Sequence, residues 1–162
     1  MIVISDTSPI HYLVLTDTID ILAALFAETV VPPAVLAELL HPHAPQVVRE
    51  WASKLPEWLA ISSPATVDPR LELGPGEAEA ISLAIETHAT LLLMDDRRAR
   101  REAEARGLSV AGTVSVLAAA SKRGLIDLAT TIAKLRQTNF HIADSILDRV
   151  LKEDAERKQG IP

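Results

Sequence analysis

The sequence predicts an α/β fold in which helices cover both faces of a central parallel sheet, followed by a helical C-terminal tail. Short aliphatic segments alternate along the chain with segments whose apolar residues repeat every three or four positions. The aliphatic segment from Leu91 to Met94 is apolar at every position, as expected for a strand buried on both faces. The segments between the strands have the length of helical crossovers, which parallel strands require.

The first half of the chain opens with a buried β-branched strand that ends before Asp6, because Pro9 prevents central pairing further along. The segment between this strand and the capping residues 16–20 is assigned to neither a helix nor a strand, and the capping residues precede an apolar helical repeat. Pro33 suits the first turn of a helix, and the turn-like segment HPHAP at 41–45 ends it. This half should contain strands at 2–5, 29–31 and 58–61 and helices at 21–26, 33–40 and 46–54.

The second half continues the alternation after an irregular connection over residues 62–75, which contains three prolines and should be a surface loop. Paired aspartates close the central strand, and Gly112 closes the last one. This half should contain strands at 90–94 and 108–110 and helices at 76–88, 97–106, 113–122, 127–137 and 143–158.

Length and composition favour one domain over residues 1–162, with a core at about 1–125 and C-terminal helices at about 127–158. A chain of this size with 48% hydrophobic residues can bury a substantial core. The absence of cysteine excludes disulfides and thiolate chemistry and favours a cytoplasmic location. No apolar run has the length of a signal peptide or a membrane span, so we expect no membrane association.

The net charge of −6 disfavours indiscriminate binding of polyanions, so any contact with nucleic acid should be local. Five arginines crowd behind the paired aspartates: Arg97, Arg98, Arg100, Arg101 and Arg106. One interpretation is a solvated helix face paired with Glu102 and Glu104. The other is that arginines such as Arg97 and Arg100 hold a phosphate beside a metal.

Four acidic residues are candidates for one catalytic pocket. Asp6 and Asp95 each end a predicted strand, and ligands of open α/β sheets gather beyond the carboxyl ends of such strands. Glu77, in the first turn of a helix after Gly76, projects onto the helix face that should meet the sheet. Glu38 lies on the flank of an apolar helix face, which suits the edge of a cleft.

Each of these residues also has a structural interpretation. Asp6 could form an Asx-turn, Glu77 could complete a helix start, and Glu38 could be an ordinary solvated glutamate. Asp96 directly precedes a predicted helix, and an N-cap is its favoured role over a catalytic one.

Oxygen ligands of this kind suit Mg²⁺ or Mn²⁺, which need only a few carboxylates and retain coordinated water. Such ions can activate water and clamp a scissile phosphate. The histidines offer no comparable cluster, because His41 and His43 flank a proline and the other three are isolated. The residues therefore favour a Mg²⁺ or Mn²⁺ site, held by Asp6, Glu77 and Asp95, over a zinc site.

Several motifs resemble the PIN-domain superfamily, in particular its bacterial and archaeal branch similar to VapC toxins. The resemblance covers about residues 1–125 and the segment FHIADSIL at 140–147. The motifs are, in order, VISDTSPI, VVPPAVLAEL, LGPGEAEAISLA, LLLMDDRRARREAEARGL and VAGTVSVL. The resemblance implies a Rossmann-like α/β/α sandwich, an acidic pocket for Mg²⁺ or Mn²⁺, and cleavage of single-stranded RNA.

Carried over motif by motif, the resemblance places Asp6, Glu38, Glu77 and Asp95 on the family's acidic positions. Ser8 and Thr113 fall on its supporting hydroxyl positions, and Asp96 is an additional acid. It also implies a homodimer, for which the apolar helices after Gly112 are candidate contacts, and an antitoxin partner.

The resulting hypothesis is a metal-dependent endoribonuclease, for which the resemblance implies the role of a toxin. One alternative is a catalytically silent module whose acidic cleft docks a basic partner. Another is a phosphohydrolase of the haloacid-dehalogenase type, which needs a second aspartate two residues after the first. Position 8 is serine, and no lysine closely precedes the DD pair, so this alternative ranks lowest.

Overall fold

A five-stranded parallel sheet forms the centre of the computed structural model, which describes residues 1–160. Its strand order is β3-β2-β1-β4-β5. The strands are β1 (Val3–Ser5), β2 (Thr29–Val31), β3 (Leu59–Ile61), β4 (Leu91–Leu93) and β5 (Val110–Ala111). This architecture confirms the predicted α/β/α sandwich. The domain predicted over residues 1–162 includes two residues outside the described part.

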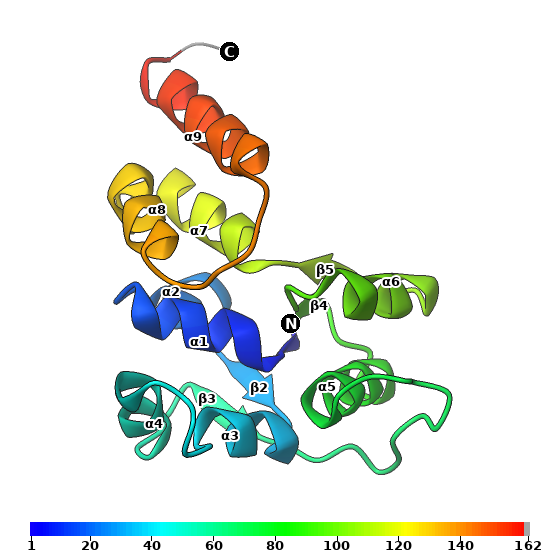
Figure 1. Ribbon diagram of the computed structural model, residues 1–162. Coiled ribbons are helices and arrows are strands. Elements are labelled where there is room, and N and C mark those ends of the chain that lie inside the picture. The colour runs from blue at the N-terminus through cyan, green and yellow to red at the C-terminus, as the bar shows by residue number, and fades with distance from the viewer. Residues whose placement is uncertain (161–162) are drawn as a thin grey trace.

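Nine helices accompany the sheet within residues 1–160 (Figure 1). They are α1 (Thr7–Leu15), α2 (Ile21–Phe26), α3 (Pro33–Leu39), α4 (Gln46–Ala52), α5 (Pro75–Glu86), α6 (Arg97–Ala105), α7 (Thr113–Lys122), α8 (Leu128–Arg136) and α9 (Asp144–Lys158). Apart from α1, every helix and strand was predicted, with ends within two residues of those observed. In this described part, no helix combines the length and the apolar character needed to cross a membrane.

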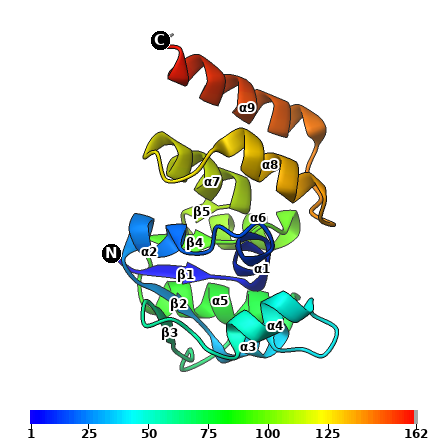
Figure 2. The same cartoon turned by 90° about the vertical axis from the view of Figure 1, so that its left-hand side faces the viewer.

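Alternate strand residues face two separate apolar clusters, because side chains of a strand point to opposite faces. Ile4 and Leu92 pack with α5 and α6 on one face. Val3 and Leu93 pack on the other face in a larger cluster that contains α1 and α7. Figure 2 shows α7 and α8 beside each other on this second side, with α9 beyond both of them. Helices thus cover both faces of the sheet, and its carboxyl edge stays available for a site.

The apolar side chains of α7 and α8 are buried within the chain itself. Val116 and Leu117 of α7 and Leu128 and Ile132 of α8 all belong to the larger cluster. These buried side chains are therefore not free for the dimer contact proposed for the helices after Gly112. The homodimer stays a prediction, and a contact through these helices would use side chains other than these four.

Helix α1 is the one element that the sequence analysis did not predict. It begins directly after Asp6, and its third residue is Pro9, which had suggested a loop. A proline in the first turn of a helix costs little, because the amide it lacks has no partner within the helix there. Ile10, Leu13 and Val14 are buried on the face that meets the sheet and α7. The correction places Ser8 in a helix rather than in a loop.

Candidate active site

Asp6 and Asp95 meet at the carboxyl edge of the sheet, where the strand order reverses. The chain runs from β1 outward to β2 and β3, and then returns to the other side of β1 with β4 and β5. Crevices at such a reversal are where ligands of open α/β sheets bind. The N–H of Asp6 donates to the carbonyl oxygen of Leu93 at 2.9 Å, which fixes the end of β1 beside the end of β4. The fold therefore brings two acids 89 positions apart to one edge.

Glu38 joins the N-terminal ends of α1 and α5. The hydroxyl of Thr7 donates to Glu38 Oε2, and the backbone N–H of Gly76 donates to Glu38 Oε1 at 3.2 Å. Glu77, the next residue, lies in the first turn of α5. Because Thr7 directly follows Asp6, these contacts bring Glu38 and the start of α5 next to the end of β1.

Asp95 is held by the first residue of α7. The Thr113 N–H donates to Asp95 Oδ1 at 2.7 Å, and the Thr113 hydroxyl donates to Oδ2 at 2.6 Å. Gly112 leaves room for this contact, since a Cβ there would lie 2.9 Å from Asp95 Oδ1. Thr113 is fully buried, so its role is to orient Asp95 rather than to touch a substrate.

The electrostatics of the site are dominated by uncompensated negative charge. Asp6 is 4% exposed, and its Oδ1 has no hydrogen-bond partner. Burial raises the pKa of Asp6 to about 7; the neighbouring carboxylates of Glu77, Glu38 and Asp95 add to the rise, and the Thr7 amide opposes it. A buried carboxylate without a counter-charge is costly, which favours its neutral form when no cation is bound.

Glu77 and Asp95 share this environment. Burial raises the pKa of Glu77, with Asp96 and Glu38 adding to the effect. Burial also raises the pKa of Asp95, against the hydrogen bonds from Thr113 and the charge of Arg100. Within residues 1–160, none of the four predicted acids forms an ion pair closer than 4 Å. The site thus lacks the permanent salt links that would argue against a ligand.

The donor set fits a hard divalent cation. An orphaned buried oxygen on Asp6, surrounded by further carboxylates, is what such an ion would stabilise. In the described chain no three carboxylate or imidazole side chains stand close enough to hold one ion together. The fit is therefore to an ion that takes few protein oxygens and completes its shell with water, as Mg²⁺ commonly does.

The other predicted residues divide between structural positions and an adjoining cleft. Asp96 caps α6, accepting from the Ala99 N–H at 2.9 Å, which confirms its predicted N-cap. Ser8, Arg97 and Arg100 border a cleft of about 1070 Å³ that also reaches Asp95. Of the ion pairs predicted for a solvated helix face, Arg106–Glu102 forms, whereas Glu104 pairs with no described residue. Arg98 and Arg106 meet Glu72 and Asp68, respectively, which lie outside this helix.

Sequence reasoning did not single out several residues of the site. Thr7 was passed over in favour of Ser8, although its hydroxyl is the group that binds Glu38. The cleft also contains Tyr12, Phe140 and Arg149, which lie far from the acids in sequence. The helical spacing of Ile146, Arg149, Val150 and Glu153 could have shown that they share one face, but not that the face lies opposite α6.

The fold and the site define an α/β/α domain with a partly buried group of acidic residues at the carboxyl edge of a parallel sheet. The family model DUF3368, described as a PIN domain, matches residues 2–156. The chain belongs to this family, and PIN domains are typically metal-dependent nucleases. No curated protein matches the chain.

A solved structure supports the same fold. The chain is similar to a PilT N-terminus domain protein, SSO1118, from the hyperthermophilic archaeon Sulfolobus solfataricus P2. The TM-score is 0.53 at 16% sequence identity, and the match covers 88% of this chain and 100% of the other. At this identity the similarity concerns the arrangement of helices and strands alone.

Proposed function

We propose that the protein is an endoribonuclease that needs Mg²⁺ or Mn²⁺ to hydrolyse phosphodiester bonds of single-stranded RNA. The observation that carries this proposal is the buried, unpartnered Oδ1 of Asp6 in a group of carboxylates at the reversal point of the sheet. Membership of the PIN-domain family supports metal-dependent phosphodiester chemistry. The choice of RNA rests on the resemblance of the motifs.

Asp6, Glu77 and Asp95 would hold the ion, partly through coordinated water molecules, because the three carboxylates do not converge closely enough for all of them to bind it directly. When bound, the ion would offset the negative charge on the phosphate oxygens and lower the pKa of a coordinated water. Thr113 keeps both oxygens of Asp95 in place, and Thr7 with Gly76 keeps Glu38 beside the pocket, where its carboxylate can orient the attacking water. Arg100 lies next to Asp95 and can meet the substrate phosphate. Hydrolysis in this arrangement would leave a 5′-phosphate and a 3′-hydroxyl.

The direct test measures cleavage of single-stranded RNA in Mg²⁺ and in EDTA by the wild type and by Asp6→Asn. We expect cleavage by the wild type in Mg²⁺ only, and a loss of at least about 100-fold in kcat for Asp6→Asn, since an essential electrostatic group is removed. Equal activity of the two proteins would reject the assigned roles.

A second measurement separates this proposal from a silent module that docks a basic partner. Isothermal titration with Mn²⁺ should give site-specific uptake in the wild type and none in Asp95→Asn. A docking surface without a metal site would show the same weak heats in both proteins.

We also propose, from the resemblance, that the nuclease is the toxin of a toxin-antitoxin pair and forms a homodimer, and, from the absence of cysteine, that it acts in the cytoplasm. Induced expression should then arrest growth, and the product of a neighbouring gene should relieve the arrest. Arrest that persists in Asp6→Asn would contradict a toxic nuclease.

A further inference from the structure

The cleft beside the acidic pocket is enclosed by elements from distant parts of the chain. Helix α6 forms one wall, α9 forms the opposite wall, and α7 lies between them. Figure 1 shows α6 on one side of β5 and α7 and α9 on the other, and residues of all three helices line the cleft. Asp95 and Asp96 also line the cleft, so it is continuous with the candidate active site.

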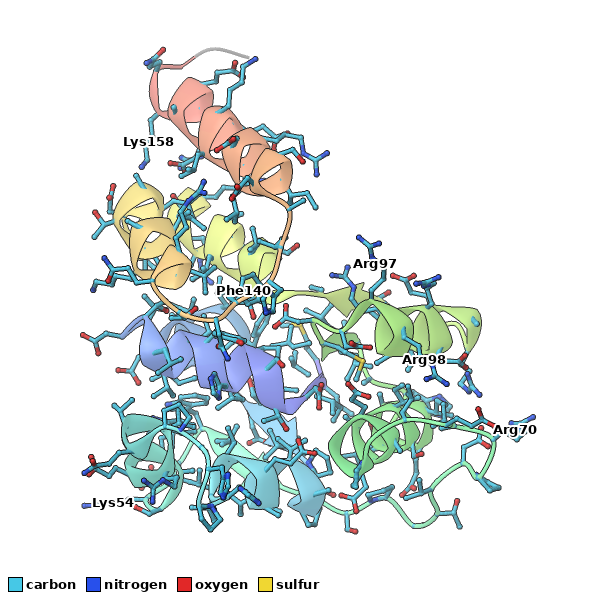
Figure 3. The ribbon with its side chains drawn as sticks, viewed as in Figure 1. Lys54, Arg70, Arg97, Arg98, Phe140 and Lys158 are labelled. Carbon is cyan, nitrogen blue, oxygen red and sulfur yellow. The ribbon has the colours of Figure 1, made fainter. Side chains whose placement is uncertain are left out.

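The two walls carry cationic side chains that have no partner of their own. Five basic and four acidic side chains line the cleft. The acidic ones are Asp95, Asp96, Glu104 and Glu153. The basic ones are Arg97, Arg100 and Arg101 of α6, Arg149 of α9 and Lys122 of α7. In residues 1–160 none of these five forms an ion pair within 4 Å. Figure 3 shows Arg97 leaving α6 on the side toward α9, whereas Arg98 leaves it on the side of α5. The basic helix thus directs its unpaired charges into the cleft.

An aromatic side chain is held in the same cleft. Phe140, in the segment before α9, packs edge-on against Tyr12 of α1 with ring centroids 4.8 Å apart. The Tyr12 hydroxyl donates to Asn139 Oδ1 at 2.9 Å, which ties this segment to α1. Both rings line the cleft and are half-buried, so part of their surface can meet a ligand.

A second cleft, of about 640 Å³, also borders the candidate site, at Glu38, but no phenylalanine or tyrosine lines it. Its lining includes His11, His41 and His43 but no lysine or arginine. A chain with a net charge of −6 repels nucleic acid in general, so a strand needs local cations along its path. The α6–α9 cleft supplies them, and the histidine cleft does not.

We infer that the α6–α9 cleft is the channel that holds a single nucleic-acid strand on one side of the bond to be cut. Arg97, Arg101 and Arg149 bind its phosphates from the two walls, and Phe140 stacks on an unpaired base. Duplexes are disfavoured, because their base faces are already covered and cannot stack on an aromatic ring. This inference rests on the proposed nuclease function, whose site it extends.

The test measures binding of a fluorescent 12-nucleotide oligouridylate by anisotropy in the Asp6→Asn background, where the strand stays intact. Arg149→Glu is compared with Lys152→Glu, a matched reversal on α9 at an exposed residue outside the cleft lining. We expect about tenfold weaker binding for Arg149→Glu, with a slope of log K against log salt reduced by about 0.7 to 1. Lys152→Glu should change the affinity by less than about twofold, since a surface charge far from the strand is screened.

A second variant tests the aromatic contact. Phe140→Leu keeps an apolar side chain for packing and removes the stacking surface. This variant should therefore bind the oligouridylate more weakly and bind a duplex as the unsubstituted protein does. A melting curve of each variant shows whether the fold is retained. Equal effects of Arg149→Glu and Lys152→Glu, duplex affinity equal to that of the single strand, or a polyglutamate peptide bound as tightly as the oligonucleotide would each overturn the inference.

Different results would contradict the nuclease function and the strand-binding channel. In the wild-type background Arg149→Glu should raise KM and leave kcat at saturation within about twofold, because the residue binds the strand away from the reacting phosphate. Unchanged cleavage kinetics in this variant would overturn the channel and leave the nuclease intact. Specific strand binding in the cleft without metal-dependent cleavage by the wild type would overturn the nuclease alone.

Discussion

Asp6 holds an ionisable group in an environment that favours its neutral form. Its Oδ1 is buried and unpartnered, and three further carboxylates lie near it. Without a cation the charged form is destabilised by burial and by repulsion from these neighbours. Function and stability therefore place opposite demands on this position.

We expect Asp6→Asn to stabilise the metal-free protein while it abolishes cleavage. The amide keeps the shape of the carboxylate and removes a buried charge, which should raise the free energy of unfolding at pH 8 by about 1 to 3 kcal/mol. Thermal unfolding in EDTA should show a rise in Tm of about 2 to 4 °C per kcal/mol. A lower Tm than that of the wild type would show that the Asp6 charge is already compensated.

The raised pKa of Asp6 should also make the folding stability depend on pH. With a pKa of about 7 in the folded protein against 3.8 as the ordinary value, Asp6 holds a proton between about pH 4 and pH 7 that the unfolded chain has released. Folding stability from this group is therefore greatest below about pH 4 and falls as the pH rises toward 7. Each unit of pKa difference corresponds to about 1.4 kcal/mol.

Urea unfolding in EDTA at pH 5, 6, 7 and 8 measures this effect in wild type and Asp6→Asn. The stability advantage of the variant should grow with pH and level off above about pH 7. Saturating Mg²⁺ should remove the advantage, because the ion binds the deprotonated carboxylate. A difference that does not change with pH would contradict the raised pKa.

At the scale of elements, the N-terminal end of α5 is shaped to receive Glu38. A Cβ on Gly76 would lie 2.5 Å from Glu38 Oε2 and 2.8 Å from Oε1. The Glu38 side chain is flexible and exposed, so it can move away at little cost in stability. Position 76 therefore requires glycine for steric reasons, because a side chain there would occupy the space of the Glu38 carboxylate.

We expect Gly76→Ala to lower the cleavage rate while it changes the free energy of unfolding by less than about 1 kcal/mol, since alanine is also the better helix former. Its effect on kcat should match that of Glu38→Ala, and the double variant should show no further loss. Gly74→Ala is the control, because nothing lies within 4 Å of a Cβ at that position. Additive losses in the double variant would separate Gly76 from Glu38.

Helix α6 combines the two interpretations that the arginine run left open. The pattern of charges indicated a helix but could not assign its faces, because both faces of this helix carry arginines. Arg98 and Arg106 meet acids of the 62–74 connection, while Arg97 and Arg101 border the cleft. The division follows from the positions of α5 and α9, which no local pattern contains.

At the scale of the whole molecule, α9 is fastened to α7 by a nearly buried carboxylate. Asp154 accepts from the Ser121 hydroxyl at 2.6 Å and from Arg157 at 2.9 Å, and it pairs with Lys158 at 2.9 Å. Although burial opposes ionisation, these hydrogen bonds hold the pKa of Asp154 at about 2. Its contribution to stability is thus present above about pH 4 and lost as the pH falls toward 2.

We expect Asp154→Ala to lower the free energy of unfolding by about 1 to 3 kcal/mol, because Ser121 is left buried without its partner. Strand affinity in the cleft should fall as well, since α9 forms one wall. Asp148→Ala on the same helix is the control; it removes only an exposed pair with Arg136 and should cost less than about 1 kcal/mol. Chemical denaturation at pH 7.5 measures both, and equal losses would show that Asp154 does not anchor the helix.

The sequence by itself determined the alternation of strands and helices, the N-cap at Asp96 and the acids that end β1 and β4. These features depend on periodicity, capping and strand ends, which are local properties of the chain. Helix α1 was not predicted because Pro9 was interpreted as part of a loop, whereas it lies in the first turn of the helix.

Only the tertiary structure decided that Thr7 binds Glu38, that Thr113 binds Asp95 and that α9 faces α6. The physical reason is that these contacts join residues brought together by the order of the strands and by packing on two faces of one sheet. Packing of that kind depends on the whole chain at once, so no segment of sequence contains it.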